Sequence, residues 1–156
     1  MAPNKGITVL EILMAVAIIA IITAVVIPSL SKFRKEQTLN NSTSDIISLL
    51  NKARNDTVSS LNSTNYGVHF ETTRAVYFIG SVFDNNAPTN SVVTIDTSAS
   101  IPVSGGISLN GGGSDVIFTR LTGETANYGT ITVRLVSDAT RQKTITISKT
   151  GAISSN

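Results

Sequence analysis

Few side chains in this sequence could carry out catalysis or bind a metal ion. The chain has one histidine, His69, and no cysteine, which argues against a thiolate nucleophile, a disulfide and a zinc site. His69 falls in a predicted strand, and no G-x-S-x-G turn supplies a serine nucleophile. Gly111-Gly112-Gly113 has neither a Walker lysine nor Rossmann spacing, and Asp84-Asn85-Asn86 is more typical of a turn than of a calcium site. We therefore predict that the protein is not an enzyme and uses no cofactor or metal.

The charges along the chain are sparse and mixed. Twelve basic and ten acidic residues give a formal net charge of +2, so the composition does not by itself indicate a nucleic-acid partner. A loose basic set lies near the C-terminus, at Arg134, Arg141, Lys143 and Lys149. The wide spacing and the few aromatic residues favour a solvated strand face over a DNA-binding surface. DNA binding stays open as an alternative.

One ionisable residue, Glu11, stands inside the longest apolar stretch. Residues 12–27 are all apolar except Thr23, and extension back to Ile7 adds only Thr8 and Glu11 as polar residues. About twenty apolar residues are enough for a helix to cross a bilayer, so the sequence predicts a transmembrane helix. A secretory signal peptide is the alternative, but no small-residue cleavage site is clear after the run. Glu11 either needs a partner in apolar surroundings or benefits from the positive end of the helix dipole.

The stretch Lys5-Gly6-Ile7-Thr8-Val9-Leu10-Glu11 resembles the prepilin peptidase site of type IV pilins and type II secretion pseudopilins. The resemblance implies cleavage after Gly6 and N-methylation of the new N-terminal residue, Ile7, which stands where phenylalanine is commonest in the family. It also implies that Glu11 and Pro28 serve subunit assembly.

These residues suit the chemistry that the resemblance implies. Gly6 has no side chain, so the peptide there can enter a protease site in an extended form. Cleavage creates an α-ammonium at Ile7, and in an apolar filament core the Glu11 carboxylate could neutralise the ammonium of a neighbouring subunit. Pro28 cannot donate a hydrogen bond to the carbonyl of Ala24, so we expect a kink or bend in the helix.

A helical pattern continues past the apolar run. Apolar and small residues recur at spacings of three and four, at Leu39, Thr43, Ile46, Leu50, Ala53, Thr57 and Leu61. The stripe predicts an amphipathic helix that packs on a globular domain. Turn-forming residues at 62–65 are expected to end it.

The sequence after Asn65 changes to short alternating runs such as Thr130–Val136 and Lys143–Ser148, separated by Gly, Asn, Ser and Pro. Runs of this kind are expected to form an antiparallel sheet, or two packed sheets, with one buried face. The predicted fold class is therefore α+β, with a long N-terminal helix, transmembrane in its first half, packed on an antiparallel β-sheet or a two-sheet pilin domain.

Several pieces of this region are similar to GspH/FimT-type minor pseudopilins. They are Ile47–Arg54, Tyr66–Phe70, Phe118 with Gly123, and Ile145–Ile147 running into Gly151–Ile153. The resemblance implies a structural subunit of a type IV pilus or a type II secretion pseudopilus, of the minor kind that acts at initiation or at the tip. The alternatives are a major pilin and a minor pilin that binds DNA or a surface in a competence system.

These inferences divide the chain into four parts. They are a leader peptide (1–6), a transmembrane and filament-core helix (7–30), an amphipathic helix half (31–61) and a β-rich pilin globular domain (62–156). The expected partners are prepilin peptidase, other pilin or pseudopilin subunits bound through the N-terminal helix, an inner-membrane assembly platform and membrane lipid.

The expected location is a single pass through the inner, cytoplasmic membrane, with the N-terminus cytoplasmic and the globular domain outside, followed by the pilus or pseudopilus. Three basic residues, Lys32, Arg34 and Lys35, follow the apolar run, whereas only Lys5 precedes it. The positive-inside rule would therefore favour the opposite orientation. The peptidase motif takes precedence because it consists of several spaced residues and the charge difference is small.

Overall fold

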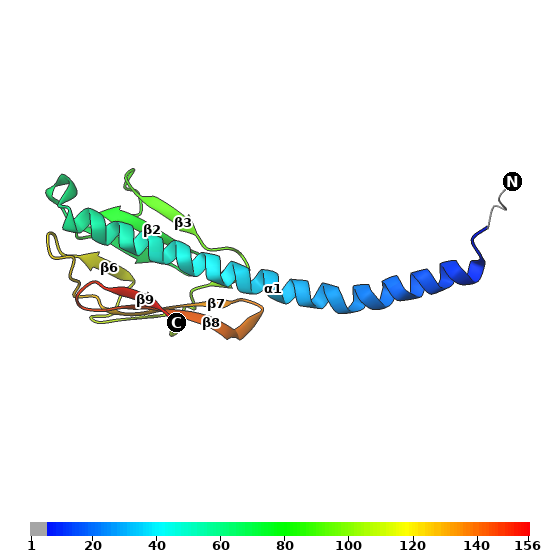
Figure 1. The fold of residues 1–156 in the computed structure, drawn as a ribbon. Coiled ribbons are helices and arrows are strands. Elements are labelled where there is room, and N and C mark those ends of the chain that lie inside the picture. The colour runs from blue at the N-terminus through cyan, green and yellow to red at the C-terminus, as the bar shows by residue number, and fades with distance from the viewer. Residues whose placement is uncertain (1–5) are drawn as a thin grey trace. The chain divides into compact units, whose positions relative to one another are not determined.

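The computed structural model of the chain describes residues 6–156, apart from the side chains of residues 25–29. The chain divides into two compact units, Met1–Glu36 and Gln37–Asn156, and each is described by itself. One long helix, α1 (Val9–Val58), contributes to both units (Figure 1). The remaining elements all belong to the second unit.

The part of α1 in the second unit is amphipathic. Leu39, Ile46, Leu50 and Ala53 are almost fully buried, as are the polar residues Thr43 and Thr57. The predicted stripe is thus confirmed over most of its length. Leu61 is the exception and is 47% exposed. The helix ends earlier than expected, because Ser60 takes a left-handed conformation and a short 3-10 turn, η1 (Leu61–Ser63), follows.

The first sheet has four antiparallel strands. Their order is β3 (Ser91–Thr94), β2 (Arg74–Ile79), β1 (Tyr66–Phe70) and β6 (Asp115–Phe118). The β1–β2 register pairs Gly67 with Phe78 and His69 with Val76. Strands β3 and β6 are the two edges of this sheet.

The second sheet has five antiparallel strands centred on β7 (Gly129–Leu135). Strand β7 pairs with β8 (Asp138–Ile147) on one side and with both β4 (Ala99–Ser100) and β5 (Ile107–Leu109) on the other, and β9 (Ile153–Ser155) pairs with β8. Alternate residues Ile131, Val133 and Leu135 are buried in β7, as predicted from the sequence pattern.

A single core joins the amphipathic part of α1 to the two sheets. Its largest buried side chains come from α1 and from both sheets, and they include Leu50, Tyr66, Phe70, Phe118 and Ile145. The helix and the first sheet are also joined by hydrogen bonds. The N–H of Tyr66 donates to Thr57 Oγ1 at 3.1 Å, and the N–H of Leu121 donates to the Thr57 carbonyl at 3.2 Å. The helix end is therefore held by the sheet that follows it.

The transmembrane part of the predicted fold class is contradicted. Among the residues that the structure describes, no helix combines the length and the apolar character needed to cross a membrane. The single-pass inner-membrane location, with a cytoplasmic N-terminus and the globular domain outside, is contradicted by the same finding.

The buried stripe of α1 yields a stability prediction. Leu50→Asp should unfold the second unit, since it removes a buried side chain worth roughly 1.5–3 kcal/mol and leaves a carboxylate in the core. The loss is large beside the roughly 5–15 kcal/mol that stabilises an ordinary domain. Circular dichroism melts of residues 37–156 measure the effect. The matched control is Asn51→Asp at the exposed neighbouring position, which should melt like the wild type. Equal melts for the two variants would contradict the packing described here.

Candidate functional site

The residues of the peptidase-like motif form the start of α1. Gly6, Ile7 and Thr8 have no regular secondary structure, and the helix begins at Val9. Gly6 is exposed, its φ is not in the left-handed region, and a Cβ built on it would meet no atom within 4 Å. No contact within residues 6–156 therefore requires glycine at this position. Lys5 and the rest of the leader, residues 1–5, lie outside the described residues.

Glu11 lies in the first turn of α1, three residues after Thr8. The N–H of Glu11 donates to Thr8 Oγ1 at 3.2 Å, so Thr8 acts as the N-cap of the helix. The order Thr8-Val9-Leu10-Glu11 has the spacing of a capping box. This signal was present in the sequence and was not recognised there. It gives Glu11 a place in the local structure, where the helix dipole also favours a negative charge.

The first part of α1 exposes large apolar side chains at almost every position. Ile7 is 75% exposed and Val9 76%, and the values for the side chains that follow, up to Ile22, stay above one half. These side chains are Leu10, Ile12, Leu13, Met14, Val16, Ile18, Ile19, Ile21 and Ile22. We call this set, together with Ile7 and Val9, the apolar helix surface. An exposed apolar surface of this extent marks an interaction site.

The predicted assembly residue Pro28 falls within α1, but its side chain lies outside the described residues. The structure therefore brings Gly6, Ile7 and Glu11 together at one end of the helix and leaves the role of Pro28 as a prediction. Thr23, the polar residue within the apolar run, donates through its hydroxyl to the carbonyl of Ile19 at 2.7 Å. It is thus satisfied without a partner from elsewhere.

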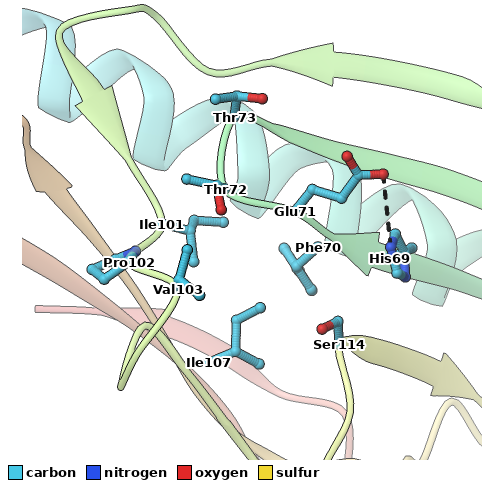
Figure 2. A pocket seen from close by; sticks show the side chains of 10 residues that line it. All are labelled: His69, Phe70, Glu71, Thr72, Thr73, Ile101, Pro102, Val103, Ile107 and Ser114. Carbon is cyan, nitrogen blue, oxygen red and sulfur yellow. Dashed lines mark ion pairs between the residues drawn. The ribbon is translucent and has the colours of Figure 1, made fainter.

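A second candidate is a cavity of about 450 Å³ beside His69. It lies between the β1–β2 turn and the segment that joins β4 to β5, with Ser114 at its rim (Figure 2). The ring of His69 stacks on Phe83, with centroids 4.0 Å apart and planes 5° apart. Its Nδ1 lies 2.5 Å from Asp115 Oδ1, and its Nε2 lies 3.8 Å from Glu71 Oε1.

The contacts of His69 fit a structural role. Both of its nitrogens face carboxylates, and one ring face is covered by Phe83. Glu71 is in turn held by two hydrogen bonds from Arg74, at 2.7 and 2.8 Å, which lower the pKa of the Glu71 carboxyl. Within residues 6–156, no group of three or more His, Asp or Glu side chains is placed to hold a metal ion. The cluster ties the β1–β2 turn to β6.

The structure also gives the positions of the other motifs that the sequence raised. Asp84 accepts the N–H of Asn86 through its carboxylate at 2.9 Å, so the expected turn is confirmed. The three glycines Gly111, Gly112 and Gly113 have φ near +80° and connect β5 to β6. Of the basic set, Arg134 lies on β7 and pairs in register with Gln142, and Lys143 lies on the adjacent strand β8 opposite Val133.

The glycines that carry the minor-pseudopilin resemblance are set by packing. A Cβ on Gly67 would lie 2.6 Å from the ring of Phe78 across the β1–β2 pair. A Cβ on Gly151 would lie 1.9 Å from the carbonyl oxygen of Gly123 and 2.8 Å from Arg54 Nε, and Gly151 also has a φ of +77°. The close approach of Gly151 to Gly123 and Arg54 therefore places the turn between β8 and β9 against the end of α1.

A polar cluster joins α1 to β2 on the outside of the core. Lys52 Nζ and Tyr77 Oη donate to the same oxygen, Asp56 Oδ2, at 2.9 and 2.8 Å. Lys52 also lies 3.6 Å above the centre of the Tyr77 ring. Burial acts to raise the pKa of Asp56, but the hydrogen bonds and the charge of Lys52 outweigh it and lower that pKa below 3.8. Burial, reinforced by Asp56, raises the pKa of Tyr77.

Comparison with known proteins identifies no relative: no protein family, no curated protein and no solved structure matches this chain. The function is therefore argued from the chain's own residues.

The Asp56 cluster predicts a pH dependence of stability. Because folding lowers the pKa of Asp56, the ionised carboxylate stabilises the fold at pH above about 3.8, and this contribution is lost as the pH falls through the folded-state pKa. The difference in free energy of unfolding between the wild type and Asp56→Asn should be constant near neutral pH and shrink in acid. Urea unfolding at a series of pH values tests this. The exposed Asp45→Asn serves as control, and a difference that grows in acid would refute the expectation.

Proposed function

We propose that the protein is a structural subunit of a pilin-type filament, of the kind found in type IV pili or type II secretion pseudopili. The observation that carries the proposal is the apolar helix surface, which has no cover in the described part of the chain. Copies that pack these helices together remove that surface from water. Each large aliphatic side chain contributes roughly 1.5–3 kcal/mol when it is fully buried.

The two units of the chain suit different tasks in such a filament. The second unit has a closed core of its own, to which the amphipathic part of α1 contributes. The first unit is a helix whose apolar side chains are exposed on consecutive positions, and therefore on all sides. A helix that is apolar all round is suited to burial among several neighbours. We assign polymerisation to the first unit.

The start of α1 supports processing before assembly. Gly6 is exposed and meets no packing constraint among the described residues, so the requirement for glycine would come from a processing peptidase that binds this segment. Cleavage after Gly6 would place a new α-ammonium at Ile7, close in sequence to the Glu11 carboxylate. In a packed helix core, that carboxylate would neutralise the ammonium of a neighbouring copy, because an unpaired buried charge is heavily penalised.

The proposal predicts a specific defect in Glu11 variants. Glu11→Gln keeps the side-chain length and an oxygen that can accept a hydrogen bond in a capping box, but it removes the charge. Both Glu11→Gln and Glu11→Ala should therefore fail to enter filaments in the cells that produce the protein. Electron microscopy and immunoblots of sheared filaments measure incorporation.

Two controls make this test decisive. Circular dichroism melts should match the wild type for both variants, since the second unit does not contain Glu11. N-terminal sequencing should show that the mature chain begins at Ile7. If Glu11→Gln assembles normally and only Glu11→Ala fails, Glu11 serves the helix cap and the charge-pairing part of the proposal is wrong.

A further inference from the structure

A groove follows the line where α1 passes the edge strand β3. It consists of two adjoining hollows of about 240 and 320 Å³ that share Asp45. The first is lined by Thr38, Asn41, Ser42 and Asp45 from α1, with Thr94 and Asp96 from the end of β3. The second is lined by Asp45, Ser48, Leu49 and Lys52 from α1, with Val93 from β3.

The groove exists because short side chains line α1 where it faces an unpaired strand edge. Strand β3 pairs only with β2, so its outer edge has no strand beside it in the described chain. Seven α1 residues line the groove, and five of them recur at spacings of three and four, at residues 38, 41, 45, 48 and 52. They form a strip of the helix between the buried stripe and the solvent-exposed face.

The two ends of the groove differ in chemistry. Leu49 and Val93 make one end apolar. At the other end, Asp45 and Asp96 bring two carboxylates, and neither takes part in the ion pairs found among the described residues. Lys52, the one cation in the lining, is already held by Asp56 and the Tyr77 ring. An occupant should therefore present an apolar side chain followed by a cation.

The chain itself contains such a segment just before the second unit begins. Phe33 is 66% exposed and Leu30 47%. Leu30, Phe33 and Arg34 stand at i, i+3 and i+4 within α1, which places them on one face of the helix. Lys32 and Lys35 flank that face and are also exposed.

We propose that the Leu30–Phe33–Arg34 face of one copy docks into the groove between α1 and β3 of the next copy in the filament. Phe33 packs on Leu49 and Val93, and Arg34 pairs with Asp45 and Asp96. Arginine suits this role because its planar guanidinium can donate to two carboxylates at once. The inference rests on the proposed filament function and adds to it a defined contact between neighbouring second units and helices.

Cysteine cross-linking tests the contact directly, since the natural chain has no cysteine. Two single variants, Leu30→Cys and Ser48→Cys, are produced together in the cells that make the filament, and the filaments are then oxidised. Mass spectrometry should find a disulfide between residue 30 of one copy and residue 48 of another. The control replaces Ser48→Cys with Asn51→Cys, which lies on the solvent-exposed face of the same helix and should give no such product.

Charge exchange gives an independent readout. Arg34→Glu and Asp45→Arg should each reduce filament yield, and the chain with both substitutions should recover it, because the pair is restored with opposite polarity. Failure of recovery together with an absent 30–48 disulfide, in cells where wild-type filaments form, overturns this contact and leaves the filament proposal standing. A disulfide from residue 48 to a different protein also overturns docking between copies. Absence of wild-type filaments would overturn both proposals.

Discussion

The burial of α1 is the constraint on which the rest of the structure depends. A helix with an apolar face must cover that face, because exposed apolar surface costs free energy in proportion to its area. From Leu39 onward, the helix meets this need within its own chain, where Leu39, Ile46, Leu50 and Ala53 are almost fully buried. Before Ala24, the apolar side chains have no such cover in the described residues. The same helix is thus a core element in one unit and an uncovered surface in the other.

The second unit is organised around holding this helix in place. Thr57 accepts the N–H of Tyr66, and its carbonyl accepts the N–H of Leu121, so the helix end is tied to both β1 and the segment after β6. The turns at Gly123 and Gly151 come so close to each other and to Arg54 that a Cβ could not be added at Gly151. On the opposite side of the helix, the Asp56 cluster ties α1 to Tyr77 in β2.

The sequence predicted features that depend on local periodicity. The three- and four-residue spacing of Ile46, Leu50 and Ala53 identified the buried stripe, and the alternation of Ile131 and Val133 identified a half-buried strand. It did not predict features that depend on which strands meet. The pairing of His69 with Asp115 follows from the β1–β6 register, and the groove at Asp45 follows from β3 being an edge.

One sequence-based interpretation is contradicted by the structure, and another missed a local contact. The transmembrane prediction is contradicted, because no helix among the described residues has both the length and the apolar character needed to cross a membrane. The interpretation of Glu11 overlooked the Thr8 cap, although the capping-box spacing was legible in the sequence. Both concern the start of α1, where the side chains of the helix are largely exposed. The assignment of that segment to assembly rests on its exposed apolar surface.

The most direct test of this account is the accessibility of that surface before and after assembly. A single cysteine at Leu13, which is 61% exposed, can be labelled with a thiol reagent in the isolated chain and in intact filaments. A cysteine at Val103, 91% exposed in the second unit, serves as the reference. The account predicts that both cysteines react in the isolated chain and that only the one at position 103 reacts in the assembled material. Equal labelling of the two positions after assembly would contradict the burial of the apolar helix surface between subunits.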